Sequence, residues 1–282
     1  MLPLDHPLAF LPFEVLIVGL LFLCFRHALP FGAPAMFKLA SGVVFGILLE
    51  WATIEQLDAY QYGTQYLLMV DTVPIAVGVG WGVILYSAML LTDNTNLNPW
   101  LRPVADALLA LNIDVAIDAI AIRAGMWDWG KGLEHDYFGV PYENFWAWFW
   151  VIFCFSLSYR ICYRLTIKYH VAIAPIVAIP LSVCGVLITN RIIVSYIPET
   201  HTLAVIIGVL LTALAVVLYN KPQLRSPNID PLAAWVPLCF HAAFLLLGML
   251  TGVIFEHQIL MLISLVMIGI SLYLHRHALF KD

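Results

Sequence analysis

Long apolar runs divide this chain almost from end to end and restrict it to one class of fold. We predict membrane-spanning helices near residues 10–26, 36–54, 73–92, 104–124, 144–164, 171–190, 202–219, 232–253 and 257–275. A helix needs about 20 apolar residues to cross the hydrocarbon core, and only a helix or a closed barrel satisfies its backbone hydrogen bonds there. The chain is therefore predicted to be an all-α polytopic integral membrane helical bundle of about nine transmembrane helices, with residues 1–282 as a single transmembrane domain.

Composition supports the same class. Hydrophobic residues make up 62% of the chain and charged residues 11%, whereas soluble domains carry about 25% charged residues. Such a chain cannot cover its surface with polar groups, so part of that surface must face membrane lipid. The net charge is −5 and no basic patch occurs, so nucleic acid is not an expected partner.

The placement of lysine and arginine predicts the orientation. With the N-terminus outside, Arg123, Lys131 and Arg191 fall on the outer side. The inner side then receives Arg26, Lys38, Arg102, Arg160, Arg164, Lys168, Lys221, Arg225, Arg276 and Lys281. We predict the N-terminus out and the C-terminus in, in the bacterial inner (cytoplasmic) membrane.

Acidic residues inside the predicted spans are the first candidates for function. Glu14, Glu50, Asp114 and Asp118 all lie toward the outer side. A carboxylate exposed at the bilayer centre costs about 2.5–3.5 kcal/mol, so these groups are expected to face the bundle interior or a cavity. Glu14 is predicted to reach water at the interface, and Asp106 is predicted to be only a helix-start residue near the inner interface.

Asp114 and Asp118 are four residues apart and therefore share one helix face. Two carboxylates one turn apart in a medium of low dielectric constant resist ionising together. One of them is expected to stay protonated near neutral pH, where it could act as a proton donor. Arg123 is the predicted counter-ion for one member of the pair.

Gly42, Gly46 and Glu50 recur at intervals of four residues. Small residues at this spacing let two helices approach closely. Glu50 is therefore predicted to lie on a packed face and not a lipid face, at a depth similar to that of the aspartate pair.

Two predicted outer connections are rich in aromatic residues and glycine. One contains Trp127, Trp129 and Tyr137; the other contains Tyr62 and is followed by Trp81. An aromatic belt at the membrane surface and a lid over a site are both compatible with these loops. Of Trp146, Trp148 and Trp150, at least one is expected to face lipid.

Several of these stretches together carry a family resemblance. They are residues 46–51, 73–81, 114–118 (Asp-x₃-Asp), 125–129 (Gly-x-Trp-x-Trp), 137–141 (Tyr-Phe-Gly-Val-Pro) and 144–145 (Asn-Phe). In them the chain resembles the membrane carotenoid biosynthesis proteins that include carotenoid 1′,2′-hydratases of the bisanhydrobacterioruberin hydratase type. The resemblance covers roughly residues 40–155, and no motif was matched in the last three or four spans.

The resemblance implies an enzyme that acts on a long apolar isoprenoid or carotenoid. It would protonate a polyene C=C bond and then add water, or cyclise or isomerise the product. Asp118 or Asp114 is the expected proton donor, and Glu50 is expected to position water. The expected substrate-binding residues are Trp127, Trp129, Tyr137, Tyr62, Trp81, Asn144 and Arg123. No cofactor and no metal is expected.

The chain departs from the family pattern at two places. Residues 58–66 replace a Phe-Pro-Phe-Gly-x-Tyr-x-Tyr run, and Gly78 stands where the family has a proline. The first change falls in a loop expected to face the substrate, so it bears on substrate choice more than on the fold.

Two other functions remain open from the sequence. An intramembrane prenyltransferase that depends on Mg²⁺ also uses Asp-x₃-Asp, but it needs a second acidic motif and nearby cations for the diphosphate. A non-catalytic carotenoid- or lipid-binding subunit of a membrane complex would need only the aromatic cavity. A transporter is less favoured because no pair of broken helices is seen.

Overall fold

The computed structural model describes residues 7–165, 170–226 and 229–280, and the predicted inner-side cations Lys168 and Lys281 lie outside them. Each predicted span corresponds to one long helix. These helices are α1 (Pro7–Ala28), α2 (Ala33–Leu57), α3 (Ile75–Asp93), α4 (Arg102–Arg123), α5 (Tyr142–Leu165), α6 (His170–Ser195), α7 (Glu199–Tyr219), α8 (Leu232–Thr251) and α10 (Gln258–Leu279). A 3₁₀ turn, η1 (Leu29–Phe31), joins α1 to α2, and the one-turn helix α9 (Val253–Glu256) joins α8 to α10.

The fold is an all-α polytopic helical bundle, as predicted. Eight of the long helices are long and apolar enough to cross a membrane. The exception is α4, which carries Arg102, Asp106, Asp114, Asp118 and Arg123. This helix packs against α3, α5, α7, α8 and α10, so its charged groups are enclosed by other helices. By contrast, α6, α7 and α10 expose rows of leucine, isoleucine and valine, the surface that lipid would cover.

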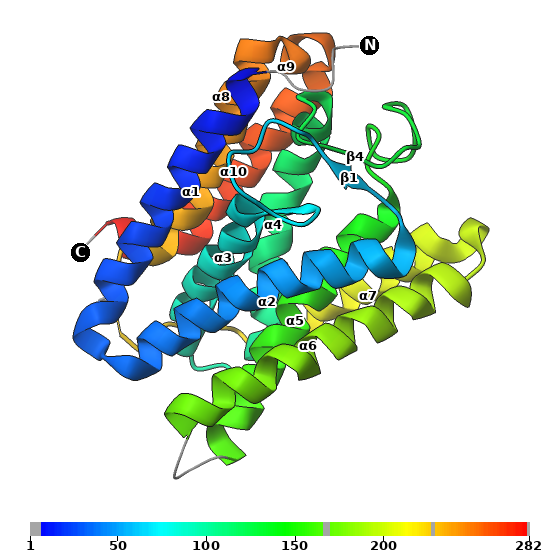
Figure 1. Cartoon of the computed structure of the whole chain (residues 1–282). Helices are drawn as coiled ribbons and strands as arrows, with labels where there is room; N and C mark the ends of the chain where they lie inside the picture. Colours follow the sequence, from blue (N-terminus) through cyan, green and yellow to red (C-terminus); the bar gives the residue numbers. More distant parts are fainter. Residues whose placement is uncertain (1–6, 166–169, 227–228, 281–282) are drawn as a thin grey trace.

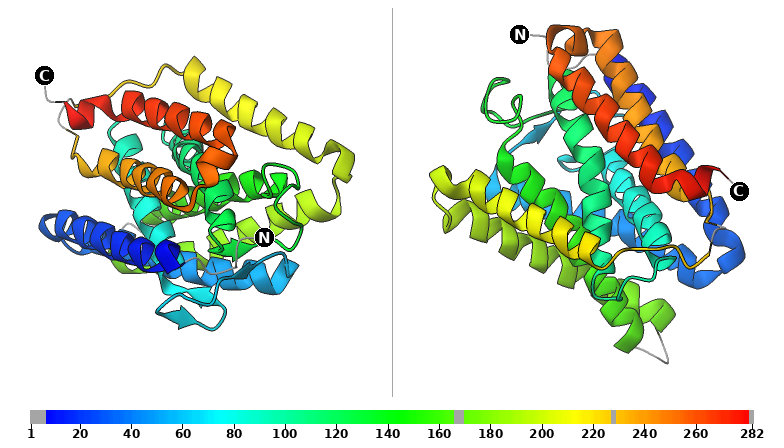
Figure 2. Two further views of the ribbon diagram at one scale, coloured as in Figure 1. Left: turned by 90° about the horizontal axis from the view of Figure 1, so that it is seen from above. Right: turned by 180° about the vertical axis from the view of Figure 1, so that it is seen from behind.

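The helices form two groups that are inclined to one another (Figure 1). Helices α1, α3, α4, α8 and α10 run steeply in that view, while α2, α5, α6 and α7 lie across them (Figures 1 and 2). We call the end that holds the start of α1 and residues 58–74 and 124–141 the outer end, after the predicted orientation. The opposite end, which holds η1 and the connection from α3 to α4, is the inner end.

Close packing of α2 on α3 is made possible by glycine. A Cβ atom added at Gly46 would lie 2.7 Å from the carbonyl oxygen of Gly78 and 2.7 Å from Cβ of Trp81. A Cβ atom added at Gly78 would lie 2.9 Å from the backbone nitrogen of Ile47. The packed face predicted from the four-residue spacing is confirmed, and it leaves no room for a proline at position 78.

Replacing Gly46 with Ala is expected to destabilise the protein by about 1–3 kcal/mol, because the added methyl group overpacks the α2–α3 contact. Thermal unfolding of the detergent-solubilised protein would measure the change. Gly19→Ala is the matched control, since nothing lies within 4 Å of a Cβ atom added at Gly19 in α1. Equal stability of the two variants would show that the close approach is not needed.

At the outer end, two loops are tied together by backbone pairing. Strand β1 (Gln61–Tyr62) pairs antiparallel with β4 (Trp127–Asp128), with Tyr62 opposite Trp127. The pairing continues as Gly63 donates its N–H to the carbonyl oxygen of Met126 at 3.0 Å. A second short ribbon, β2 (Met69–Val70) with β3 (Val73–Pro74), leads the chain into α3.

Two sequence predictions about acidic residues were wrong. Glu14 does not reach water: its side chain is buried, and Oε1 accepts the N–H of Leu67 at 2.9 Å. Asp106 is not merely a helix-start residue, because it is fully buried and accepts hydrogen bonds from Thr92 at 2.5 Å and Ser156 at 2.6 Å. Helix packing, which a single span does not reveal, encloses both groups.

Candidate functional site

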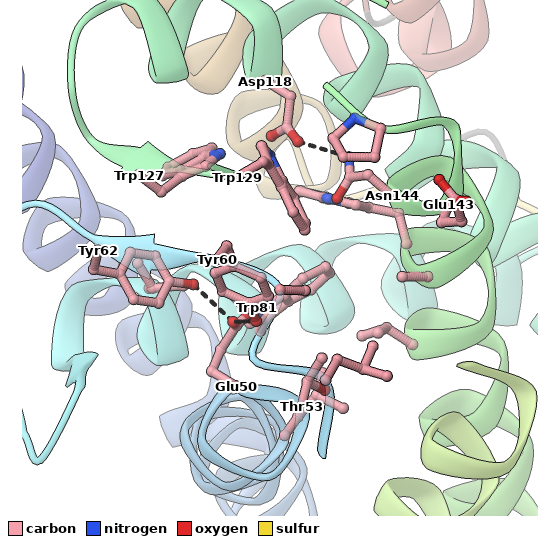
Figure 3. Close-up of a pocket in the computed structure, with 18 of the residues that line it drawn as sticks. Glu50, Thr53, Tyr60, Tyr62, Trp81, Asp118, Trp127, Trp129, Glu143 and Asn144 are labelled. Carbon is pink, nitrogen blue, oxygen red and sulfur yellow. Dashed lines mark hydrogen bonds between the residues drawn. The ribbon is translucent and has the colours of Figure 1, made fainter. Parts of the chain in front are cut away.

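A cavity of about 430 Å³ opens beneath the paired outer loops (Figure 3). We call it the outer cavity. Helices α2, α3, α4, α5, α6 and α8 contribute to its wall, and residues 58–62 and 127–131 cover it. Its surface is mostly aromatic and aliphatic, with a few polar groups, which is the usual character of a site for a small apolar ligand.

Glu50 enters the outer cavity from the packed face of α2. Trp81 donates its indole N–H to Oε1 at 2.5 Å, and Tyr62 donates its hydroxyl to Oε2 at 2.7 Å. The Tyr60 hydroxyl donates a further hydrogen bond to Oε2. Three donors around one carboxyl group fix its orientation in the cavity.

The two tyrosines remain donors because they cannot readily ionise. Burial, and then the negative charge of Glu50, raises the pKa of the Tyr60 and Tyr62 phenols well above the usual value. Both hydroxyls therefore stay protonated throughout the physiological pH range, and their hydrogen bonds to Glu50 persist.

Asp118 enters the outer cavity from α4, on the side opposite Glu50 (Figure 3). The side-chain amide of Asn144, in the first turn of α5, donates to Asp118 Oδ2 at 2.6 Å and to Asp114 Oδ1 at 3.1 Å. Asp118 Oδ1 is buried and has no hydrogen-bond partner within the described residues. One oxygen of Asp118 is thus held by Asn144, and the carboxyl group also interacts with that of Asp114 one helical turn away.

Aromatic rings fill the space around the two carboxyl groups. The ring centroids of Tyr60 and Trp129 are 4.7 Å apart, and those of Trp81 and Trp148 are 4.3 Å apart. Figure 3 shows Trp127, Trp129 and Tyr60 in the region between Asp118 and Glu50. Such faces attract a cation through their π electrons.

Most of the predicted site residues come together in this cavity. Its lining includes Glu50, Tyr62, Trp81, Asp118, Trp127, Trp129 and Asn144. The loop that carries Trp127 and Trp129 covers a cavity, so the lid interpretation describes it better than an aromatic belt. Asp114 is fully buried and does not line the cavity; it shares the Asn144 amide with Asp118, and its carboxyl group also interacts directly with that of Asp118.

The prediction that Arg123 neutralises an aspartate was wrong. Its guanidinium donates to the carbonyl oxygens of Phe138 and Leu133, the latter at 2.8 Å, and lies 3.5 Å from Glu134. Tyr137 also stands apart from the cavity lining, since its hydroxyl donates to the carbonyl oxygen of Val115 at 2.8 Å. Both residues fasten the loop of residues 124–141 to the end of α4.

Some lining residues were missed. Tyr60 was noted only as part of an aromatic loop, and the last spans were given no role, yet Asn190 of α6 and Phe240 and Phe244 of α8 line the cavity. Trp148, which the sequence did not single out as a site residue, also lines the cavity. Trp146 is buried, whereas Trp148 and Trp150 are partly exposed, so the expectation that at least one of the three faces lipid stays a prediction.

The arrangement offers one member of a buried aspartate pair, a second carboxyl group held by three donors, and aromatic faces between them. These are the parts needed for proton transfer to and from an apolar molecule. Asp58 and Glu143 also line the cavity, and Lys131 is its cation among the described residues. Across the described residues, no group of three or more His, Cys, Asp or Glu side chains is arranged to hold a metal ion.

Comparison with known proteins identifies the family. The model of the carotenoid biosynthesis protein family matches residues 15–219, from α1 to the end of α7, a wider region than the motifs alone indicated. No curated protein and no solved structure matches the chain. With the family model covering well over half of its length, the chain belongs to the carotenoid biosynthesis proteins and serves carotenoid metabolism as an integral membrane protein.

Proposed function

We propose that the protein is a carotenoid hydratase that adds water across a terminal C=C bond of an acyclic polyene by acid catalysis. The observation that supports this most directly is the placement of Asp118 and Glu50 on opposite sides of one aromatic cavity. Family membership supports the substrate class. We place the enzyme in the bacterial cytoplasmic membrane, where an apolar polyene would be dissolved.

The first step is proton transfer from Asp118 to one carbon of the double bond. The π electrons form the new C–H bond, Asp118 becomes a carboxylate, and the neighbouring tertiary carbon becomes a carbocation. Asn144 holds Oδ2 of Asp118 at 2.6 Å, which orients the carboxyl group toward the cavity. The faces of Trp127, Trp129 and Trp148 would stabilise the cation.

The second step is capture of the carbocation by water. The water oxygen forms the new C–O bond, and Glu50 accepts one of the water's protons. The three donors of Glu50 keep its carboxylate oriented for this role. Transfer of that proton back to Asp118 through water restores both groups, so the net change is the addition of one water molecule.

The size of the outer cavity fits part of the substrate. Its volume of about 430 Å³ lies within the range of about 300–1,000 Å³ for small-molecule sites. A long isoprenoid chain exceeds that volume, so the cavity would enclose the reacting end while the rest of the polyene extends toward lipid. Thr53 on α2 and Ile193 and Val194 on α6 line one side of the cavity and would guide the chain outward.

Expression in a host that accumulates lycopene and related acyclic carotenoids would test the proposal. Liquid chromatography and mass spectrometry of pigment extracts are expected to show a product heavier than the substrate by one water. Glu55→Gln is a suitable control variant because Glu55 is an exposed acid on the same helix as Glu50, and it should form the same product.

A product with the same mass as the substrate would indicate that the protein cyclises or isomerises the polyene, with the same acid as proton donor, and does not hydrate it. Absence of any new pigment from well-expressed, membrane-inserted protein would contradict hydration of these substrates. In that case, binding of the unchanged pigment by the purified protein would favour a non-catalytic subunit.

A further inference from the structure

A second cavity, of about 400 Å³, lies at the inner end of the bundle between η1 and the inner ends of α2, α3 and α5. We call it the inner cavity. Both cavities reach α3, where Ile84 lines the outer one and Tyr86 the inner one. Their charged groups lie far apart: in α4, Arg102 at the inner cavity and Asp118 at the outer one are separated by 16 residues, roughly 24 Å along a helix. The proposed hydration does not use the inner cavity.

Cations dominate the polar lining of the inner cavity. Among the described residues, Lys38, Arg102, Arg160 and Arg164 line it, together with one carboxylate, Asp93. The chain as a whole is acidic, with a net charge of −5. The excess of positive charge in this cavity therefore arises because folding brings these cations together, and not from the overall composition of the chain.

Three of these cations share a single carboxylate. Asp93 lies 2.9 Å from Arg160, 3.3 Å from Lys38 and 3.4 Å from Arg102. The side chains of Arg102 and Arg160 are each 11% exposed, so water screens them poorly. One carboxylate at these distances cannot neutralise three cations.

A second carboxylate, that of Asp106, lies buried next to the cavity, but it does not balance the excess of positive charge. Asp106 neutralises one further charge, because it lies 2.6 Å from Arg160. Arg164 is exposed at the rim and makes no ion pair with any described residue. Four cations thus face two carboxylates, and an anion bound in the cavity would relieve the repulsion among the cations.

The rest of the wall indicates which kind of anion fits. Tyr86, Tyr159 and Tyr163 line the cavity, and Phe31 stands at its edge with 64% of its surface exposed. A phosphate group would meet the cations while attached apolar chains met the rings and the lipid beyond. Basic pockets between helices at a membrane surface suit anionic headgroups in this way.

We propose that the inner cavity is a binding site for a phosphate ester anion, with the headgroup of an anionic phospholipid as the source that its apolar rim favours. Arg164 is exposed at the rim, and Lys38, which shares Asp93 with two arginines, has a side chain that is 25% exposed; these two cations are the ones placed to contact this ligand. Arg160 donates hydrogen bonds to Asp93, Asp106, Thr92 and Ser156. It therefore contributes positive charge to the cavity without contacting the ligand directly.

The test uses the full-length protein in nanodiscs of equal parts phosphatidylglycerol and phosphatidylcholine. Native mass spectrometry would count the lipids that stay bound to the protein after it is released from the nanodisc. We expect the wild-type protein to retain phosphatidylglycerol preferentially. The variant with Lys38→Gln and Arg164→Gln should retain it less, by about fivefold for each cation removed. Arg276→Gln is the matched control, since it removes an exposed inner-end cation that stacks on Tyr273 outside the cavity.

A second arm separates a lipid from free phosphate. Inorganic phosphate, added in zwitterionic detergent at constant ionic strength, should raise the unfolding temperature of the wild-type protein but not of the double variant if the source is free phosphate. If only phosphatidylglycerol shows the effect, the source is the lipid. Equal retention and equal stabilisation in all three proteins would overturn the proposal. If the double variant does not fold, Arg164→Gln alone, at an exposed position, carries the same comparison.

Discussion

Replacing Asp118 with Asn is expected to lower hydration by about 10²–10⁴-fold, the range for loss of a general acid, while leaving the protein folded. An amide cannot deliver the proton that starts the reaction. The carbonyl oxygen of the new side chain can still accept the Asn144 amide that now lies 2.6 Å from Oδ2 of Asp118, so the local packing should persist. Product per amount of membrane-inserted protein, measured by liquid chromatography and mass spectrometry, would give the effect.

Asp114→Asn provides the sharpest comparison. Asp114 has the same side chain one turn away but lies outside the cavity lining, so its replacement should cost much less activity than that of Asp118. Wild-type turnover in the Asp118 variant, alongside loss of turnover in the Asp114 variant, would show that Asp114 and not Asp118 is the proton donor. Wild-type turnover in both variants would remove acid catalysis by this pair altogether.

The largest expected effect on stability belongs to Arg160. Arg160→Met leaves Asp106 without its cation in a fully buried position, and breaking a buried ion pair by removing one partner costs about 3–5 kcal/mol. The unfolding temperature in detergent, followed by tryptophan fluorescence, should fall accordingly. Arg276→Met, which removes an exposed arginine from α10, should change it little.

Adding Asp106→Asn to the Arg160 variant tests the physical reason for that loss. Removing the second charge eliminates the unpaired carboxylate, so much of the lost stability should return. An equal loss in the single and double variants would assign the effect to the lost bulk of Arg160 rather than to the stranded charge.

The helices could be predicted because apolar runs and polar breaks determine where a chain crosses a bilayer. The interior positions of Glu50 and Asp118 could also be predicted from residues alone. The glycine spacing around Gly46 placed Glu50 on a packed face, and membrane burial of an acid requires an interior position. These are local properties of single helices.

The positions of Arg123 and Tyr137 could not be obtained in this way. Both side chains serve the loop of residues 124–141, whose path depends on the pairing of Tyr62 with Trp127 across more than sixty residues of sequence. The contribution of Phe240 from α8 likewise depends on which helices become neighbours. Helix order in the bundle is a property of the whole chain, and no single span carries it.

The charges of α4 also constrain how the protein is made. A translocon that tested α4 alone would meet Asp106, Asp114 and Asp118 without their partners, and each would oppose release into lipid. Each of the three accepts a hydrogen bond from α5, at Arg160, Ser156 or Asn144, and Asp106 accepts a further one from Thr92 of α3. Because α5 emerges after α4, α4 gains its full set of donors only when α5 joins it, so biogenesis favours entry of the two helices into the bilayer as a hairpin.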